Sequence, residues 1–135
     1  MKITFLLISL LLITNTIYSQ SLTPEQIIGK WKVVKILKKP SNPNFKDFLK
    51  GFESATFEFK SDSKFNLTTN NNNKIFSMLT DHTQNVDWII RKNIPVISIG
   101  SKTDHYNTLN IYAKLGETNI FQLEESEIVL QVEKL

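Results

Sequence analysis

From residue 30 onward, apolar and polar side chains alternate in short runs that are separated by turn-forming residues. Phe57 and Phe59 have polar neighbours, a polar turn follows at 61–64, and Phe65 and Leu67 then continue the alternation. A period of two residues is typical of strands with one buried face. Two such runs joined by a short polar turn predict a β-hairpin.

Similar runs along the rest of the chain predict the remaining strands. Some alternate strictly, and the run at 94–99 is more continuously apolar. Pro95 has no amide hydrogen to donate, so it places the start of that strand at an edge or a bulge. With the hairpin, the runs amount to about eight or nine strands, which predicts an all-β domain. They cover residues 30–37, 75–79, 86–91, 94–99, 108–113, 119–123 and 128–133.

Two features predict that the sheet closes into an antiparallel up-and-down β-barrel of about eight strands. The first strand breaks its alternation at Val33 and Val34, which predicts a β-bulge and hence local curvature. Lysines are concentrated in residues 30–50, whereas glutamates are concentrated in residues 116–135. In a closed sheet the first and last strands are neighbours, so these charges could pair across the outer face. The same charges are equally consistent with two ordinary solvated faces.

A short helical turn is predicted before the first strand. Thr23, Pro24 and Gln26 have the residue types of an N-cap, a first-turn proline and a capping-box partner. The turn they begin should end at Gly29, because glycine is a frequent helix terminator.

A second helix is predicted in the long connection between the first two strands. Asn44 can cap a helix within residues 43–51, and Phe45, Phe48 and Leu49 then share one face at spacings of three and four. An apolar helical face must cover something apolar. At this point of the chain, it would form a lid over one end of the barrel.

The first nineteen residues have the pattern of a cleaved secretory signal peptide. Lys2 supplies a positive start, residues 3–13 are almost continuously apolar, and residues 14–20 are polar with small side chains. The apolar run is about half of what a membrane-spanning helix needs, so no permanent anchor is expected. Cleavage after Ser19 would leave residues 20–135 as one exported domain. No cysteine follows that could carry a lipid.

The composition excludes several classes of function. The formal net charge is +3, which is too near balance to indicate nucleic acid as a partner. There is no cysteine, so disulfides, thiol catalysis and thiolate metal sites are excluded. We therefore expect a fold that depends on its apolar core, and no cofactor.

The segment that ends in Gly29-Lys30-Trp31 resembles the opening of lipocalin-like domains, in which a helical turn leads into a Gly-x-Trp strand. The hairpin at 56–67 and the last two strands also resemble small bacterial lipocalin-like proteins. The resemblance implies that Trp31 plugs the closed end of the barrel. It also implies a cation over that ring, supplied in many lipocalins by an arginine. Because no arginine follows Arg91, Lys134 is the candidate here.

The sequence offers little for catalysis or metal binding. His82 and His105 each follow an aspartate, and a His-Asp pair can orient an imidazole or begin a metal site. No third ligand type completes a motif, and no serine lies in a nucleophile-elbow context. We therefore expect surface loop histidines, no catalytic residue and no metal site.

Aromatic side chains are the strongest candidates for a binding site. A barrel of about eight strands either fills with side chains or holds one small ligand. One hypothesis is therefore an exported carrier of a small apolar molecule; the alternative is a filled barrel that acts on another protein through its surface. The cavity wall and lid of the first hypothesis would consist of Phe45, Phe48, Phe57, Phe59, Phe65, Trp88, Tyr112 and Phe121.

The lysines of residues 30–50 also allow two interpretations. They could dock a phosphate-rich or protein partner, or they could form an ordinary solvated face. Neither the ligand, the partner nor the oligomeric state follows from the sequence.

Overall fold

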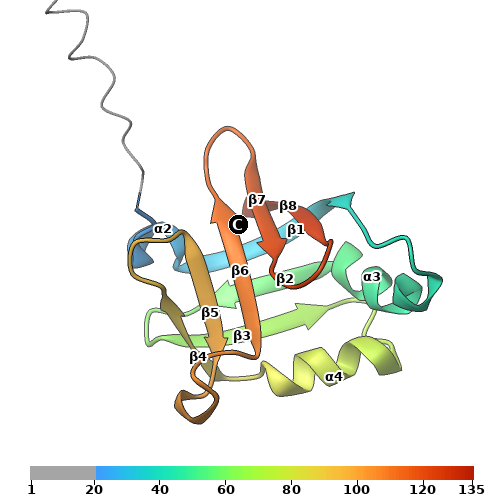
Figure 1. Ribbon diagram of the computed structural model, residues 1–135, viewed down its shortest axis with the longest axis horizontal. Coiled ribbons are helices and arrows are strands. Elements are labelled where there is room, and N and C mark those ends of the chain that lie inside the picture. The colour runs from blue at the N-terminus through green and yellow to red at the C-terminus, as the bar shows by residue number, and fades with distance from the viewer. Residues whose placement is uncertain (1–20) are drawn as a thin grey trace, which may run out of the picture.

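The computed structural model describes residues 21–135 and shows a closed antiparallel barrel of eight strands in the order of the chain (Figure 1). This confirms the predicted fold class. The predicted signal peptide at residues 1–19 lies outside the described residues. The strands are β1 (Gly29–Lys38), β2 (Ala55–Phe59), β3 (Lys64–Thr69), β4 (Val86–Ile90), β5 (Val96–Gly100), β6 (Leu109–Lys114), β7 (Asn119–Leu123) and β8 (Val129–Lys134).

The barrel closes between β1 and β8, which are paired along most of their length. The register slips by one residue between Val33 and Lys35, so the predicted bulge is confirmed. Lys32 lies opposite Glu133 on β8, but no ion pair among residues 21–135 joins these two strands. Lys30 instead contacts Glu58 on β2 at 3.6 Å. The charges therefore do not hold the barrel closed in the predicted way.

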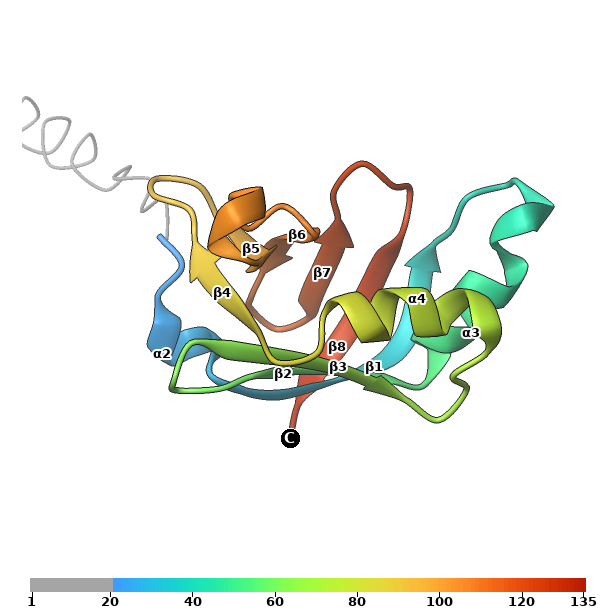
Figure 2. The same cartoon turned by 90° about the horizontal axis from the view of Figure 1, so that it is seen from below.

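A single helical turn, α2 (Pro24–Ile27), precedes β1 and lies at one end of the barrel (Figure 2). The backbone N–H of Thr23 donates to Oε1 of Gln26 at 2.9 Å, as the predicted capping box requires. Ile27 is fully buried, so the turn is fixed to the core by an apolar side chain.

The predicted helix between the first two strands consists of a 3₁₀ turn, η1 (Pro43–Phe45), and the helix α3 (Lys46–Glu53). Its cap is Asn42 and not Asn44, because Oδ1 of Asn42 accepts the backbone N–H of Asn44 at 3.0 Å. The helix also runs past Gly51, where we expected it to end. This extension places Phe52 in the core.

Residues 75–79 do not form the predicted strand. They belong to the helix α4 (Lys74–His82), whose N-terminus is capped by Oδ1 of Asn73, which accepts the N–H of Phe76 at 3.0 Å. Asn73 is the last residue of an Asn tract at 70–73, so this tract leads into a capped helix. The spacing of Phe76 and Leu79 buries a helical face rather than one side of a strand.

The helix α4 lies beside the shortest strand pairing in the barrel wall, that of β3 with β4 (Figures 1 and 2). The strands β3 and β4 share only two register pairs, Lys64 with Asp87 and Phe65 with Val86. Lys64 Nζ and Asp87 Oδ1, 2.7 Å apart, reinforce this short contact from the outside. Beyond it the two strands diverge, and α4 packs against α3 and β3.

Candidate functional site

Five of the predicted wall residues converge inside the barrel, where each is at most 5% exposed. The rings of Phe57 and Phe121 are 5.6 Å apart, and those of Phe59 and Phe65 are 5.0 Å apart. Trp88 contacts Phe59 edge-on at 5.4 Å. At these distances the rings touch one another, as aromatic pairs do in protein cores. The side chains that we assigned to a cavity wall therefore fill the interior.

The aromatic packing continues to the barrel end that is covered by α3 and α4. Phe52 stacks on Phe57 at 6.3 Å with nearly parallel planes and meets Phe76 edge-on at 4.9 Å. Phe48, half-buried at the outer end of this group, is 5.1 Å from Phe52. Sequence reasoning missed Phe52 and Phe76, although Phe52 lies four residues after Phe48 and so shares its helical face.

Two predicted site residues do not reach the interior. Tyr112 is 44% exposed on the outer face, because its neighbours Ile111 and Ala113 take the inward positions of β6. Phe45 is 39% exposed in the 3₁₀ turn, before the first residue of α3. The assignment of Tyr112 to a cavity wall and of Phe45 to a lid was therefore wrong.

Trp31 lies at the α2 end of the barrel and contacts both α2 and the end of β8. Its Nε1 donates to the carbonyl oxygen of Ile27 at 2.7 Å, and its ring packs on Phe121 at 5.4 Å. Lys134 Nζ lies 5.5 Å from the ring centroid, which is the cation we expected over this ring. Gly29 leaves room for the lysine stem: a Cβ there would lie 2.9 Å from Cε of Lys134.

Replacing Lys134 with Met tests this contact. Met retains most of the apolar stem that covers Trp31 and removes the cation. We expect urea denaturation to show a loss of about 0.5–1 kcal/mol, the usual value of an exposed cation–π contact. Lys102→Met, on a loop far from Trp31 in the sequence, serves as the control and should leave stability unchanged. Equal stability of the two variants would contradict the contact.

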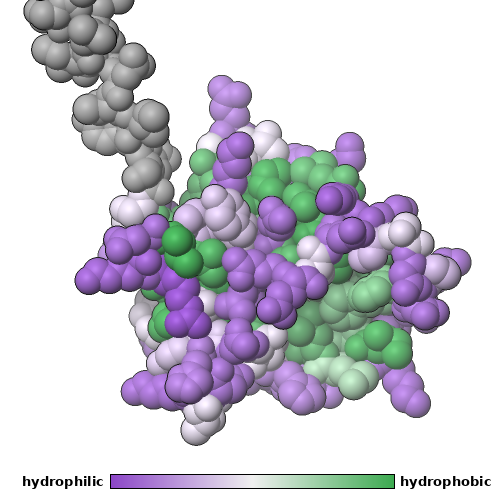
Figure 3. Space-filling view, in the orientation of Figure 1, coloured by the Kyte–Doolittle hydropathy of each residue, from purple (hydrophilic) through white to green (hydrophobic). Residues whose placement is uncertain are grey.

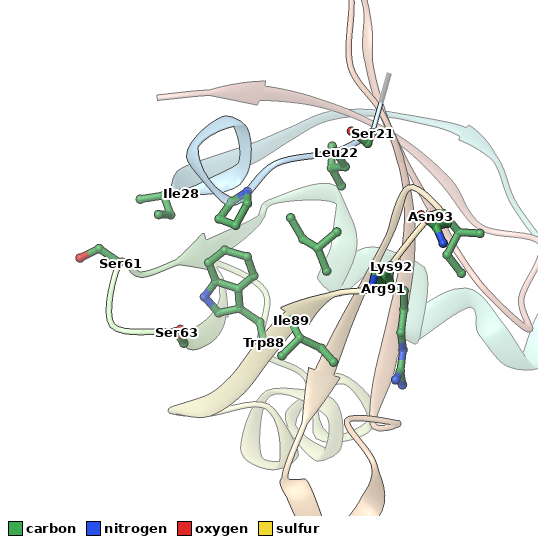
Figure 4. A pocket seen from close by; sticks show the side chains of 13 residues that line it. Ser21, Leu22, Ile28, Ser61, Ser63, Trp88, Ile89, Arg91, Lys92 and Asn93 are labelled. Carbon is green, nitrogen blue, oxygen red and sulfur yellow. The ribbon is translucent and has the colours of Figure 1, made fainter. Parts of the chain in front are cut away.

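The α2 end also carries a pocket of about 550 Å³ between the helical turn and the β4–β5 hairpin (Figure 4). Trp88 forms part of its wall and is held in place by Nε1, which donates to the carbonyl oxygen of Lys60 at 3.1 Å. The pocket is open to solvent, so it is a surface depression and not an interior cavity. Its apolar lining consists of Leu22, Pro24, Ile28, Trp88, Ile89, Ile90 and Ile94.

Arg91 borders this pocket, but its guanidinium points away from it (Figure 4). Nε donates to Oγ of Ser98 at 2.8 Å, and Nη2 donates to the carbonyl oxygen of His105 at 2.9 Å. Ser98 is fully buried and donates in turn to Oδ1 of Asn110 at 2.6 Å. Arg91 thus connects the end of β4 with β5 and the following loop, a structural role that directs its guanidinium away from the pocket.

The two histidines do not form His-Asp pairs. His82 lies at the C-terminus of α4, where Nδ1 is 2.6 Å from the carbonyl oxygen of Met78. The adjacent Asp81 makes no hydrogen bond to it. His105 is exposed in a left-handed backbone conformation. Within residues 21–135, no group of three or more His, Asp or Glu side chains is placed to hold a metal ion.

Asp104 organises the loop between β5 and β6. Its carboxylate accepts hydrogen bonds from Oγ1 of Thr108 at 2.8 Å and from the N–H of Asn107 at 3.3 Å. The hydrogen bond from Thr108 is the main reason that the pKa of Asp104 lies below its ordinary value. These partners belong to the same loop, so the carboxylate orders the loop.

This shifted pKa predicts a pH dependence of the loop. Because the folded pKa is depressed, folding favours the charged carboxylate, and the stabilisation is fully present above the unfolded value of about 3.9. It is lost as the pH falls through the folded pKa. We expect the NMR signal of the Asp104 carboxyl to titrate below pH 3.9, and Thr108→Val to move that titration upward. A wild-type midpoint at or above the unfolded value would contradict the assignment.

Some apolar side chains lie on the outside of the molecule. Figure 3 shows green side chains among the charged ones over α4, where Ile75 and Met78 are exposed. Leu37 at the end of β1 is 44% exposed. Contiguous apolar patches on a protein surface are places where partners can bind.

Compared with models of protein families, with curated proteins and with solved structures, the chain matches none of them. In the part of the chain that the structure describes, none of the helices has the length and apolar character to cross a membrane. The proposed function therefore rests on the geometry of the barrel.

Proposed function

We propose that this protein is an exported, non-enzymatic β-barrel that acts through its surface as an interaction module for another protein. The filled interior carries this proposal. A small barrel can either enclose one ligand or fill with side chains, and here the rings from Phe76 to Trp31 form a continuous packed column. A ligand in this position would have to displace these rings.

The distribution of open space supports the same proposal. Five pockets of about 290–630 Å³ lie along the described residues, and all five are open to solvent. None of the five is lined by Phe57, Phe59, Phe65 or Phe121. These five pockets therefore offer a partner space on the outside of the barrel.

Export is supported by the sequence of residues 1–19. The positive start, the short apolar run and the polar end have the composition of a cleaved leader. The order of the barrel strands, Gly29 and Trp31 and the cation of Lys134 support a lipocalin-like relationship.

Photo-crosslinking in the source cells tests the interaction. A photoreactive amino acid would replace exposed residues one at a time around the barrel, with the unsubstituted protein as the negative control. We expect neighbouring exposed positions to yield one discrete adduct with the same protein. A complete scan without any protein adduct would contradict the proposal.

The α2 pocket favours a second function, the binding of a small apolar molecule at the barrel end. The observation that favours it concerns Trp88. Among the five aromatic residues that fill the interior, Trp88 is the one that also lines one of the five pockets. In a Trp31→Phe variant, Trp88 would report binding of a fatty acid such as oleate by a change in its fluorescence. We expect Ile90→Glu to abolish that change. Absence of any change at saturating oleate would exclude this function.

A further inference from the structure

A groove of about 630 Å³ lies between the last residues of β1 and the helix α3, two elements that are in contact. Figures 1 and 2 both place α3 beside the end of β1. Its apolar lining comes from Ile36, Leu37 and Leu49. Its basic lining comes from Lys39, Lys46 and Lys50. We call it the lysine groove.

The lysine groove runs beside a strand edge that has no strand partner. The strand β1 pairs with β2 only from Gly29 to Lys32, because β2 begins at Ala55. Beyond this point β1 continues to Lys38 and pairs with β8 alone. No strand among residues 21–135 therefore pairs with residues 34–38 of β1 on the side of α3. An unpaired strand edge can add an extended peptide through its backbone groups.

The charge of the groove selects the kind of peptide. Lys39 and Lys46 have no carboxylate within 4.0 Å among the described residues. The ammonium of Lys50 has one long contact, 3.9 Å from Nζ to Oδ1 of Asp47. Glu53 is the one acidic residue in the lining. An excess of lysine over carboxylate around a concave surface favours an acidic partner and repels a basic one.

We propose that the lysine groove binds an extended acidic segment of a partner protein, which lies beside residues 34–38 of β1 and directs carboxylates to Lys39, Lys46 and Lys50. Alternate side chains of an extended segment point to opposite faces, so its apolar residues would contact Leu37 while its acidic residues face the lysines. This inference rests on the proposed function, because it names the surface and the partner class of the interaction module.

The test is selection from a displayed library of random peptides of about eight residues, the length of a typical strand with its flanks. The variant Lys39→Glu/Lys46→Glu/Lys50→Glu reverses the charge of the three lysines in the groove. The matched control Lys92→Glu/Lys102→Glu/Lys114→Glu makes the same charge change on three exposed lysines elsewhere. Both variants are checked for folding by circular dichroism and thermal denaturation.

We expect the selected peptides to be rich in Asp and Glu. The groove variant should bind them at least about tenfold more weakly, and the control variant much less so, because local charge pairs outweigh net charge. Hydrogen exchange should slow at the amides of residues 34–38 when a selected peptide is bound. This readout distinguishes strand addition from attraction by side-chain charges alone.

The inference would be overturned if no peptide were selected or if the selected peptides had no excess of acidic residues. It would also be overturned if both variants weakened peptide binding equally, or if amide hydrogen exchange at residues 34–38 did not change on peptide binding. Binding to vesicles of phosphatidylglycerol without binding to any peptide would also overturn it, in favour of a lipid surface. If the groove variant still yields the same protein adduct in cells, the groove inference fails while the proposed function stands. If no adduct forms with wild type either, the proposed function fails.

Discussion

Replacing Phe57 with Ala is expected to lower the free energy of unfolding by about 3–5 kcal/mol. Phe57 is fully buried and contacts Phe52, Phe65 and Phe121, so the substitution removes a ring from the middle of the packed column. The loss combines the apolar transfer energy with the cavity that remains. Urea denaturation followed by tryptophan fluorescence measures it.

The exposed aromatic residue Tyr112 provides the matched control. Tyr112→Ala removes a ring of similar size from the outer face and should cost less than about 1 kcal/mol. The Phe57→Ala variant should also acquire affinity for a small apolar probe such as benzene, as engineered apolar cavities do. Similar losses for both variants, or benzene binding by the wild type in the interior, would contradict a filled barrel.

Replacing Gly51 with Ala is expected to destabilise the protein by about 1–3 kcal/mol or more, through overpacking. A methyl group at this position of α3 would overlap the buried ring of Phe76. Helix propensity alone predicts the opposite sign, a gain of about 1 kcal/mol for Ala over Gly. Because the overlap involves a fully buried ring, we expect the steric cost to dominate in thermal and urea denaturation.

A double-mutant cycle separates this contact from a general effect on α3. Phe76→Ala removes the ring that the new methyl group meets, so Gly51→Ala should cost much less in that background. Lys50→Ala, one residue earlier on the exposed side of the helix, should change stability little. A stabilising effect of Gly51→Ala in the wild-type background would show that Phe76 does not pack against α3 as described.

The sequence predicted the barrel because its strands obey a clear rule. Ile128, Leu130 and Val132 alternate with polar or less apolar residues, and all three are buried. The exposure of Tyr112 follows from the same rule, since it alternates with Ile111 and Ala113. Assigning it to the cavity wall gave its aromatic character more weight than its position.

The helix α4 could not be distinguished from a strand by its apolar residues alone. Ile75, Phe76, Met78 and Leu79 fit either period over so short a run. The decision depends on the cap at Asn73 and on the contact of the Phe76 ring with Gly51 and Phe52 of α3. That contact is a property of the assembled fold and not of the local sequence.

The helix α3 shows how a tertiary contact overrides a local signal. Gly51 reads as a helix end, because glycine commonly terminates helices. In the structure it lies inside the helix, where its missing side chain admits the ring of Phe76. The lysine groove was equally hidden, since it depends on how far β1 extends beyond β2.

We propose that this barrel, which is filled by its own side chains, acts through its surface. Native mass spectrometry of the protein isolated from its own compartment distinguishes it from a ligand-carrying barrel. We expect a chain that begins at Gln20 and carries no small molecule, together with a species in which it is bound to a second protein. A chain that carries a small apolar molecule in stoichiometric amount, released only when the barrel unfolds, would contradict it.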